Sequence, residues 1–199
     1  LSLEKLLPIF GNSFSNARLD PKAVFGRIAP LVLEIGSGMG ETTAEIAREN
    51  PQTDFVAIEV HGPGVGSLLK KIAAFELKNL RVIRHDAVEV LAQMIGDGSL
   101  AGIHLFFPDP WPKKRHHKRR LVQAAFAALA ARKLAAGGYF HAATDWPEYA
   151  AQIEEVFSSS SCFDQELPAQ KTRPITKFER RGIGLGNPVR DLLFLRRKE

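Results

Sequence analysis

The sequence contains a single cysteine, Cys162, and has no apolar run long enough to cross a membrane. One thiol cannot form a disulfide within the chain, so nothing requires an oxidising compartment. A membrane-spanning helix needs about 20 apolar residues, and runs such as 192–195 are far shorter. The chain also lacks an initial methionine and the charged-then-apolar pattern of a signal segment. We expect a cytoplasmic protein without membrane association, in which residues 1–24 are a remnant of a longer N-terminal segment.

The 199 residues carry a net charge of only +5, but the positive charge is concentrated in one place. Residues 113–120, "KKRHHKRR", contain six Lys or Arg and two His. A basic block of this density favours a phosphate-bearing partner, and nucleic acid first. A solvated loop is the alternative that composition leaves open. The two histidines have no plausible metal-ligating partners nearby in the sequence, so we expect no metal.

Short apolar runs alternate with segments of helical periodicity over the first two thirds of the chain. Buried strands are predicted at 31–35, 55–58, 80–83, 103–107 and 139–142. Helices are predicted at 41–50, 67–77 and 88–95, and along the apolar stripe from Leu121 to Leu129. Strands separated by helices imply right-handed crossovers and a mainly parallel sheet.

The last third departs from this alternation. A helix is predicted at 147–157, followed by strands in "CFDQEL" and "VRDLLFLRR" with only a loop at 168–188 between them. Two strands without an intervening helix predict an antiparallel pair at one edge of the sheet. The expected fold is α/β, with a mainly parallel seven-stranded sheet, helices on both faces and one domain spanning 1–199.

Three glycines follow the first predicted strand directly, in "LVLEIGSGMGE". Gly36, Gly38 and Gly40 lie at the carboxyl end of a parallel strand, where open α/β sheets bind nucleotide-like ligands. A dinucleotide fingerprint would need glycine at position 41, where the chain has Glu41. The pattern therefore favours a ligand without a pyrophosphate, such as S-adenosylmethionine. A purely structural glycine turn remains the alternative.

Acidic residues occupy the neighbouring strand ends. Glu59 follows the second strand, where a carboxylate can bind both ribose hydroxyls. Asp86 follows the third strand and either meets the adenine or caps the next helix. Glu34, inside an apolar strand, needs a partner, and the cationic end of a ligand is one candidate. Three carboxylates around one glycine loop fit a cationic sulfonium cofactor better than an anionic dinucleotide.

The segment "FFPDPWP" joins the fourth strand to the basic run. Three prolines restrict the backbone around Asp109 and Trp111, so one carboxylate and one aromatic ring are held with little conformational freedom. "DPWP" resembles the Asp/Asn-Pro-Pro-aromatic motif of methyltransferases that modify exocyclic amines. A rigid turn with a buried tryptophan is the structural alternative.

The basic run is predicted to lead into the helix that carries Leu121 to Leu129. Positive side chains near a helix N-terminus oppose its dipole, so stability alone would favour acidic residues there. We therefore interpret the run as a cradle for the RNA backbone. Its members are Lys113, Lys114, Arg115, Lys118, Arg119 and Arg120.

From about Phe25 to Phe194 the chain resembles the bacterial tRNA (guanine-N7-)-methyltransferase family, which has a class I, Rossmann-like, S-adenosylmethionine-dependent fold. The segments that carry the resemblance are "LEIGSGMG", "IEVHGPGVGSLL", "FFPDPWPKKRHHKRR", "ATDWPEYA" and "TKFERRG". The family methylates guanosine 46 in the tRNA variable loop. The resemblance implies tRNA as the partner; the sequence leaves open whether the protein is a monomer or a homodimer.

The resemblance also assigns roles to individual residues. It implies that Glu34, Glu59, Asp86 and Asp109 contact the cofactor or lie at its pocket, and that Asp109 is the catalytic residue. It implies substrate contacts by Lys113, Asp145, Thr176, Lys177, Phe178 and Glu179. Asp145 could instead cap the helix that follows it.

Three other activities compete with this interpretation. An exocyclic-amine methyltransferase would place the methyl group elsewhere on the base, and "DPWP" is the feature that suggests it. An RNA-binding module without turnover would keep the fold but would not require Glu34, Glu59 and Asp109. A dinucleotide oxidoreductase is disfavoured by Glu41.

Overall fold

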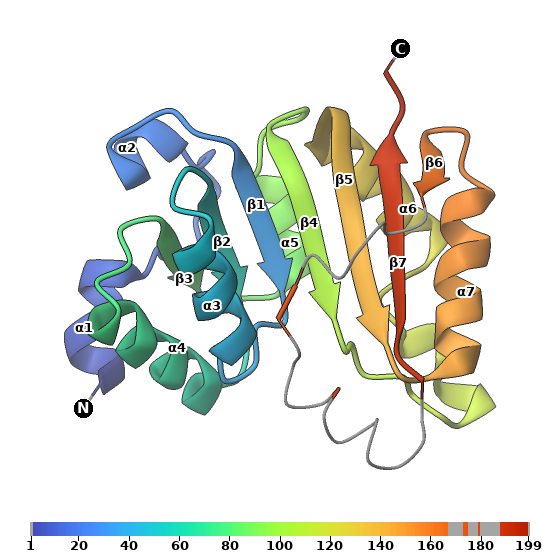
Figure 1. Ribbon diagram of the computed structural model, residues 1–199, viewed down its shortest axis with the longest axis horizontal. Helices are drawn as coiled ribbons and strands as arrows, with labels where there is room; N and C mark the ends of the chain where they lie inside the picture. The colour runs from blue at the N-terminus through green and yellow to red at the C-terminus, as the bar shows by residue number, and fades with distance from the viewer. Residues whose placement is uncertain (1, 167–172, 175–178, 180–187, 199) are drawn as a thin grey trace.

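The computed structural model describes residues 2–166, 173–174, 179 and 188–198, and in this part of the chain seven strands form one sheet (Figure 1). The strands, in chain order, are β1 (Leu31–Ile35), β2 (Asp54–Ile58), β3 (Leu80–Ile83), β4 (Leu100–Phe106), β5 (Leu134–Thr144), β6 (Phe163–Glu166) and β7 (Arg190–Arg196). Their order across the sheet is β3-β2-β1-β4-β5-β7-β6. The first five strands pair in parallel, and β7 runs antiparallel to both β5 and β6. The predicted α/β fold with an antiparallel edge pair is confirmed.

Helices cover the sheet on both faces. They are α1 (Ser2–Phe10), α2 (Pro21–Phe25), α3 (Glu41–Glu49), α4 (Gly62–Ala74), α5 (Ala87–Gln93), α6 (Ala124–Lys133) and α7 (Pro147–Ser158), with a 3₁₀ helix, η1, at Lys114–Arg119. Figure 1 shows α3 and α4 in front of β1 and β2, while α5, α6 and α7 lie behind or beside the sheet. Over β4, β5 and β7 the front face carries none of the described helices (Figure 1).

The core is divided between these two faces. Behind β4, β5 and β7, the rings of Phe140 and Phe157 stack with centroids 4.2 Å apart, and Phe194 stacks on Phe157 at 4.8 Å. On the other face, Val32, Phe55 and the apolar side of α4 form a second buried cluster. All five residues of β1 are buried, as expected of a central parallel strand covered on both sides.

Several boundaries differ from those that the sequence pattern predicts. Helix α4 begins at Gly62, five residues before the predicted start, with Pro63 in its first turn, where a missing N–H is tolerated. Helices α1 and α2 were not predicted; α1 packs against α4, and Gly11 bridges to Val82 of β3. Their short amphipathic patterns depend on this packing and are weak signals alone.

The sequence pattern predicts that the basic run leads directly into a helix carrying Leu121 to Leu129. The run instead forms the separate 3₁₀ helix η1, and α6 begins only at Ala124. These residues therefore do not oppose the dipole of α6 at its first turn. Their charge remains concentrated in one exposed turn beside the first turn of α7, where Glu148 lies 3.5 Å from His117.

Candidate active site

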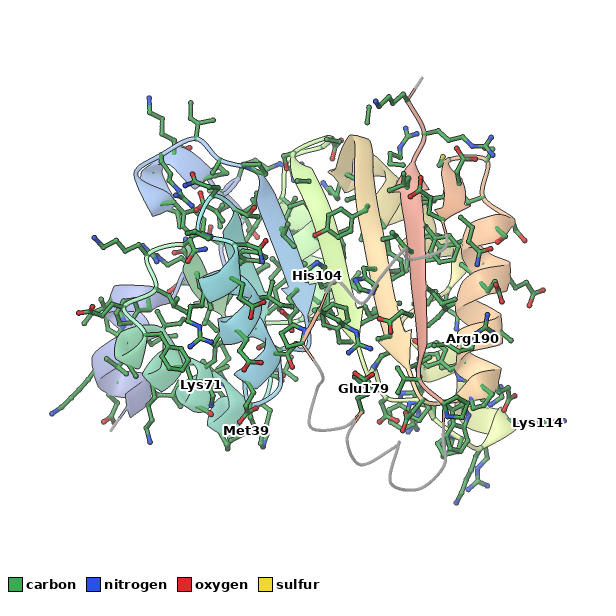
Figure 2. All side chains as sticks on the ribbon, viewed as in Figure 1. Met39, Lys71, His104, Lys114, Glu179 and Arg190 are labelled. Atoms are coloured by element: carbon green, nitrogen blue, oxygen red, sulfur yellow. The ribbon has the colours of Figure 1, made fainter. Side chains whose placement is uncertain are left out.

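The loop between β1 and α3 is held in a conformation that glycine favours. Gly36, Gly38 and Gly40 have φ angles of 73°, 56° and 78°, which other L-residues rarely adopt. At Gly40 a side chain would also collide, because a Cβ atom there would lie 2.6 Å from Leu68. Ser67 and Lys71 of α4 both donate to the Met39 carbonyl, and Figure 2 shows Met39 near Lys71 at the lower end of α4. The loop is therefore rigid before any ligand arrives.

Glu59, directly after β2, is tied to this loop. Its Oε2 accepts from the Gly38 amide at 2.7 Å, and its Oε1 accepts from the His61 amide at 2.8 Å. Each oxygen keeps acceptor capacity, since a carboxylate has about four lone-pair sites. Helix α4 packs closely against the loop at Gly38. The contact leaves no room for a side chain at Gly64, since a Cβ there would lie 2.4 Å from the Gly38 carbonyl oxygen. The carboxylate is thus fixed in orientation beside the loop.

A cavity of about 190 Å³ opens next to Glu59 at the carboxyl ends of the strands. Gly36, Glu59, Asp86 and the side chains of Val60 and Val88 are among the residues that line it. The two valines are 63% and 39% exposed, so apolar surface faces solvent where a flat ring could cover it. The cavity therefore combines a fixed acid with an apolar rim.

Asp86 is the N-cap of α5. Its Oδ1 accepts from the amides of Val88 at 2.9 Å and Glu89 at 3.1 Å, so the capping alternative is confirmed. Because the cap uses only Oδ1, and because Asp86 also lines the cavity, capping does not exclude contact with a ligand. That contact stays a prediction.

Glu34 is buried within β1, and only one of its oxygens is partnered among the described residues. Thr43 of α3 donates to Oε1 at 2.9 Å, while the buried Oε2 has no hydrogen-bond partner there. Burial raises the pKa of this carboxyl to about 7, although the Thr43 hydrogen bond works in the opposite direction. A cationic ligand group at Oε2 would satisfy the orphaned oxygen and favour the ionised form.

The proline-rich corner after β4 is strained at two residues that are not glycine. Phe107 and Trp111 have φ angles of 52° and 45°, a region that costs about 1 to 3 kcal/mol and occurs preferentially at functional sites. Asp109 lies between them, exposed, with its Oδ1 accepting from the Trp111 amide at 3.1 Å. The corner presents one carboxylate to solvent beside the strand ends.

Trp111 is half-buried, so the structure does not support the alternative of a buried core tryptophan. Its ring contacts two residues of η1. The His116 ring is nearly perpendicular to it, with the centroids 5.9 Å apart, and the Arg119 guanidinium carbon lies 4.9 Å from the Trp111 ring centroid. This cation–π contact connects the corner to the basic run.

The prediction that Arg120 contacts the RNA backbone is wrong, because its side chain is buried and the residue is only 3% exposed. Its Nε donates to the Pro110 carbonyl at 2.7 Å and its Nη1 to Gln152 at 2.7 Å. The guanidinium also lies 5.0 Å from the Tyr149 ring centroid. Arg120 therefore ties the corner to α7, a contact that only the tertiary fold creates.

The other cations of the run remain on the surface. Figure 2 shows Lys114 projecting from the lower edge of the molecule. The exposed residues are Lys113, Lys114, Arg115, Lys118 and Arg119. His117, which also belongs to the basic run, contacts Glu148 of α7.

The predicted substrate residues on other segments are only partly described. Asp145 follows β5, next to the corner, because β4 and β5 are paired up to Phe106 and Ala143. It is partly exposed and does not cap α7, whose N-cap is Trp146. Glu179 is fully buried and accepts from Arg173 at 2.7 Å. The remaining three, Thr176, Lys177 and Phe178, lie outside the described residues.

The sequence reasoning missed Arg173, Asp191 and His141, which join Glu179 in one buried network. A charged residue inside the apolar strand "VRDLLFLRR" was the available signal for Asp191. A separate cavity of about 390 Å³, lined in part by His104 and Tyr139, lies toward the amino ends of the strands. Burial lowers the pKa of His104 to about 3. Among the described residues, no hydrogen bond joins His104 or Tyr139 to the glycine loop or to the proline-rich corner.

None of the helices in the described ranges has both the length and the apolar character to traverse a bilayer. Within the same ranges, His, Cys, Asp and Glu side chains form no group of three or more that could hold a metal ion.

Comparison with known proteins places this site in a family context. Residues 28–192 match the model of a family described as putative methyltransferases. The tRNA (guanine-N(7)-)-methyltransferase of Chromobacterium violaceum is 54% identical over 200 residues, which cover 98% of this chain and 88% of that protein.

Solved structures agree on the fold. The 16S rRNA methyltransferase KamB superposes with a TM-score of 0.64 at 14% identity, over 89% of this chain and 92% of that one. A putative methyltransferase from Streptococcus mutans, in complex with SAH, gives a TM-score of 0.56 at 10% identity, over 87% and 93%. Identity this low shows the fold alone, whereas the relative from Chromobacterium violaceum is similar over nearly the whole chain. The chain belongs to the tRNA (guanine-N(7)-)-methyltransferase family.

Proposed function

We propose that the protein transfers a methyl group from S-adenosylmethionine to N7 of guanosine 46 in the variable loop of tRNA. The observation that carries this proposal is that two features lie together where the parallel strands end at their carboxyl termini. One is the glycine loop with Glu59, and the other is the proline-rich corner with Asp109. Family membership supports the chemistry, and the SAH complex of a protein with the same fold supports the cofactor.

The residues at the glycine loop fit this cofactor. Glu59 offers two oriented carboxylate oxygens to the ribose hydroxyls, and Val60 and Val88 offer apolar surface to adenine. The orphaned Oε2 of Glu34 suits an ammonium group. The φ angles of the glycines allow backbone N–H groups to approach a ligand closely. An anionic pyrophosphate would find three carboxylates here, which is unfavourable.

When bound, S-adenosylmethionine supplies an electrophilic methyl group, which the in-plane lone pair of guanine N7 takes as the sulfur leaves as a neutral thioether. Since N7 carries no proton, the protein requires no general base at that atom. Its task is to orient the ring and to stabilise the positive charge that develops on the purine. Asp109 and Asp145 are candidate acceptors for the guanine N1–H and amino groups. Glu179 is a third candidate, but it is fully buried, so it acts on guanine only if the segment that covers it moves when tRNA binds. Trp111 offers a partly exposed face for stacking on a base.

The test of this function is incubation of the protein with labelled S-adenosylmethionine and unmodified tRNA, followed by nucleoside analysis. We expect 7-methylguanosine, and loss of the label when guanosine 46 is replaced by adenosine. A methylated exocyclic amine would instead assign the second enzymatic activity. RNA binding without transfer of the label would identify a binding module.

Replacing Asp109 with Asn should separate chemistry from structure. Asn retains the side-chain oxygen that accepts from the Trp111 amide but removes the charge. We expect the barrier to rise by about 2 to 4 kcal/mol, as for loss of one preorganised electrostatic contact, with little change in cofactor affinity. Single-turnover methylation at saturating cofactor measures the effect. A near-normal rate would leave the corner a structural turn and move guanine recognition to Asp145 or Glu179.

Glu34→Gln should show how much the ionisation of the buried Glu34 carboxyl lowers the stability of the folded protein. The folded-state pKa of about 7 lies above the ordinary 4.5, so the stability from neutral Glu34 is complete below about pH 4.5 and is lost as pH rises through 7. Without cofactor, the melting temperature of the wild type should therefore fall relative to the variant between pH 5.5 and pH 8. Parallel melting temperatures across this range would contradict the assignment.

The same variant should bind the cofactor more weakly than the wild type, and the difference should be greater at pH 8 than at pH 6. The reason is that an ionised Glu34 attracts the ammonium group, whereas the neutral amide of the variant carries no charge to do so. Calorimetric titration with S-adenosylmethionine at the two pH values measures this difference. Equal affinities at pH 8 would place the ammonium group elsewhere.

Arg119 and Arg120 form a matched pair, because they are adjacent in sequence but only Arg119 is exposed. Arg119→Ala should flatten the slope of log K for tRNA against log salt by about 0.7 to 0.9, as for one lost phosphate contact. It should lower stability by no more than about 1 kcal/mol, because it loses one exposed cation–π contact with Trp111. Arg120→Ala should lower stability by about 1.5 to 3 kcal/mol, since buried charge-assisted hydrogen bonds are lost. Salt-dependent binding and thermal denaturation of both variants distinguish the roles. An unchanged salt slope for Arg119→Ala would make the run a solvated surface.

A further inference from the structure

Arg173 is the centre of a buried ionic network at the front face of the sheet, and it is only 4% exposed. Its Nε and Nη2 donate to the two oxygens of Asp191 at 2.7 and 2.9 Å. Its Nη1 donates to Oε2 of Glu179 at 2.7 Å. A planar guanidinium fixes direction as well as distance when it binds a carboxylate through two nitrogens. The position of Glu179 is therefore defined relative to Asp191.

Asp191 is in turn fixed to the sheet. It lies in β7, opposite Ala143 of β5, and its Oδ1 also accepts from His141 Nε2 at 2.9 Å. Burial raises the pKa of Asp191, but the hydrogen bonds from His141 and Arg173 outweigh it, and the pKa is lowered overall. Burial likewise lowers the pKa of Arg173, but its two carboxylates more than offset this and raise it. These directions keep Asp191 and Arg173 ionised, and Asp191 anchors the network to two adjacent strands.

The same guanidinium touches the start of the proline-rich corner. Its central carbon lies 5.5 Å from the ring centroids of both Phe106 and Phe107. Phe107 has the strained φ angle of 52° and is two residues before Asp109. One side chain therefore contacts both the carboxylate of Glu179 and the segment that presents Asp109. Figure 2 shows Glu179 near the lower, carboxyl ends of the central strands.

Stability alone does not account for this arrangement. Replacing a buried ion pair with apolar residues of similar volume is often neutral or stabilising, because desolvation offsets the Coulomb attraction. What such a network supplies is geometric definition. Misplacing a reacting or recognising group by about 1 Å can cost about 100-fold in rate, so a defined position for Glu179 has direct value in orienting a guanine ring.

We propose that Arg173 is a positioning residue, which holds Glu179 beside the corner that carries Asp109 so that the two carboxylates act together on guanine. The inference rests on the proposed function, because it assigns Glu179 to the recognition of the same base. It extends that function by naming the residue that connects the two halves of the guanine site.

Arg173→Lys tests the proposal, since lysine keeps the charge but cannot bind three carboxylate oxygens in a fixed fork. The matched control is Arg27→Lys. Arg27 also donates through two nitrogens to a fully buried aspartate, Asp54, at 2.9 and 2.6 Å. Asp54 begins β2, at the amino end of the strand and thus at the edge of the sheet opposite the corner. Both variants lose paired guanidinium hydrogen bonds to a buried carboxylate, although Arg27 directs both of its bonds to Oδ1 of Asp54. Only Arg173→Lys loses them at the proposed site.

Activity is measured on unmodified tRNA at a temperature where thermal melts show both variants folded. We expect Arg173→Lys to lower kcat by about tenfold or more, with the KM for tRNA nearly unchanged, and Arg27→Lys to leave both unchanged. If Arg173→Lys does not fold, Asp191→Asn replaces it, because it loosens the same fork while keeping Arg173. A normal kcat for the folded Arg173 or Asp191 variant overturns the proposal.

Coupling to Glu179 provides the second readout. In a Glu179→Gln background, Arg173→Lys should lower kcat by a much smaller factor than in the wild type, because the group that it positions has already lost its charge. Factors that simply multiply would overturn the proposal. If the wild type forms another methylated base, the proposed function fails. The comparison of Arg173→Lys in the wild type and in the Glu179→Gln background still decides the role of Arg173. A wild type that transfers no methyl group overturns both.

Discussion

Parallel pairing of β1, β2, β4 and β5 is the constraint on which the rest of the site depends. Because parallel strands end at the same edge, the loops that follow them converge without any direct attraction between their side chains. The glycine loop follows β1, Glu59 follows β2, the Asp109 corner follows β4 and Asp145 follows β5. Four segments that are far apart in sequence are thereby brought to one edge.

Rigidity at this edge comes from backbone contacts more than from packing. Glu59 accepts from the Gly38 amide, and Asp109 accepts from the Trp111 amide. Arg120 donates to the Pro110 carbonyl and so ties the corner to α7. Each of these bonds holds a loop whose own sequence offers few alternatives, through glycine in one case and proline in the other. A reaction that needs no proton transfer at its target atom depends mainly on such positioning.

The charges at this edge are separated by burial. Glu34, in β1 two residues before Gly36, is a buried carboxyl with one oxygen that has no hydrogen-bond partner among the described residues, whereas Lys114 and Arg119 are exposed in η1. The exposed cations interact with a polyanion at long range in water. The buried acid acts only on a group that enters its pocket, where the lower dielectric strengthens the interaction. The two sets of charges can therefore serve a nucleic acid and a cationic cofactor without neutralising each other.

The sequence by itself determined the strand and helix alternation, the antiparallel edge pair, the glycine loop and the proline-rich corner. These features depend on periodicity and on backbone preferences that neighbouring residues set. Only the tertiary structure decided that Arg120 is buried while Arg119 is exposed, and that Arg173 binds Asp191 and Glu179. Adjacent arginines look alike in sequence, and the hydrogen-bond partners of Arg120 and Arg173 are up to 32 residues away. Which cation reaches solvent and which one holds a carboxylate is a matter of long-range packing, and local pattern carries almost no information about it.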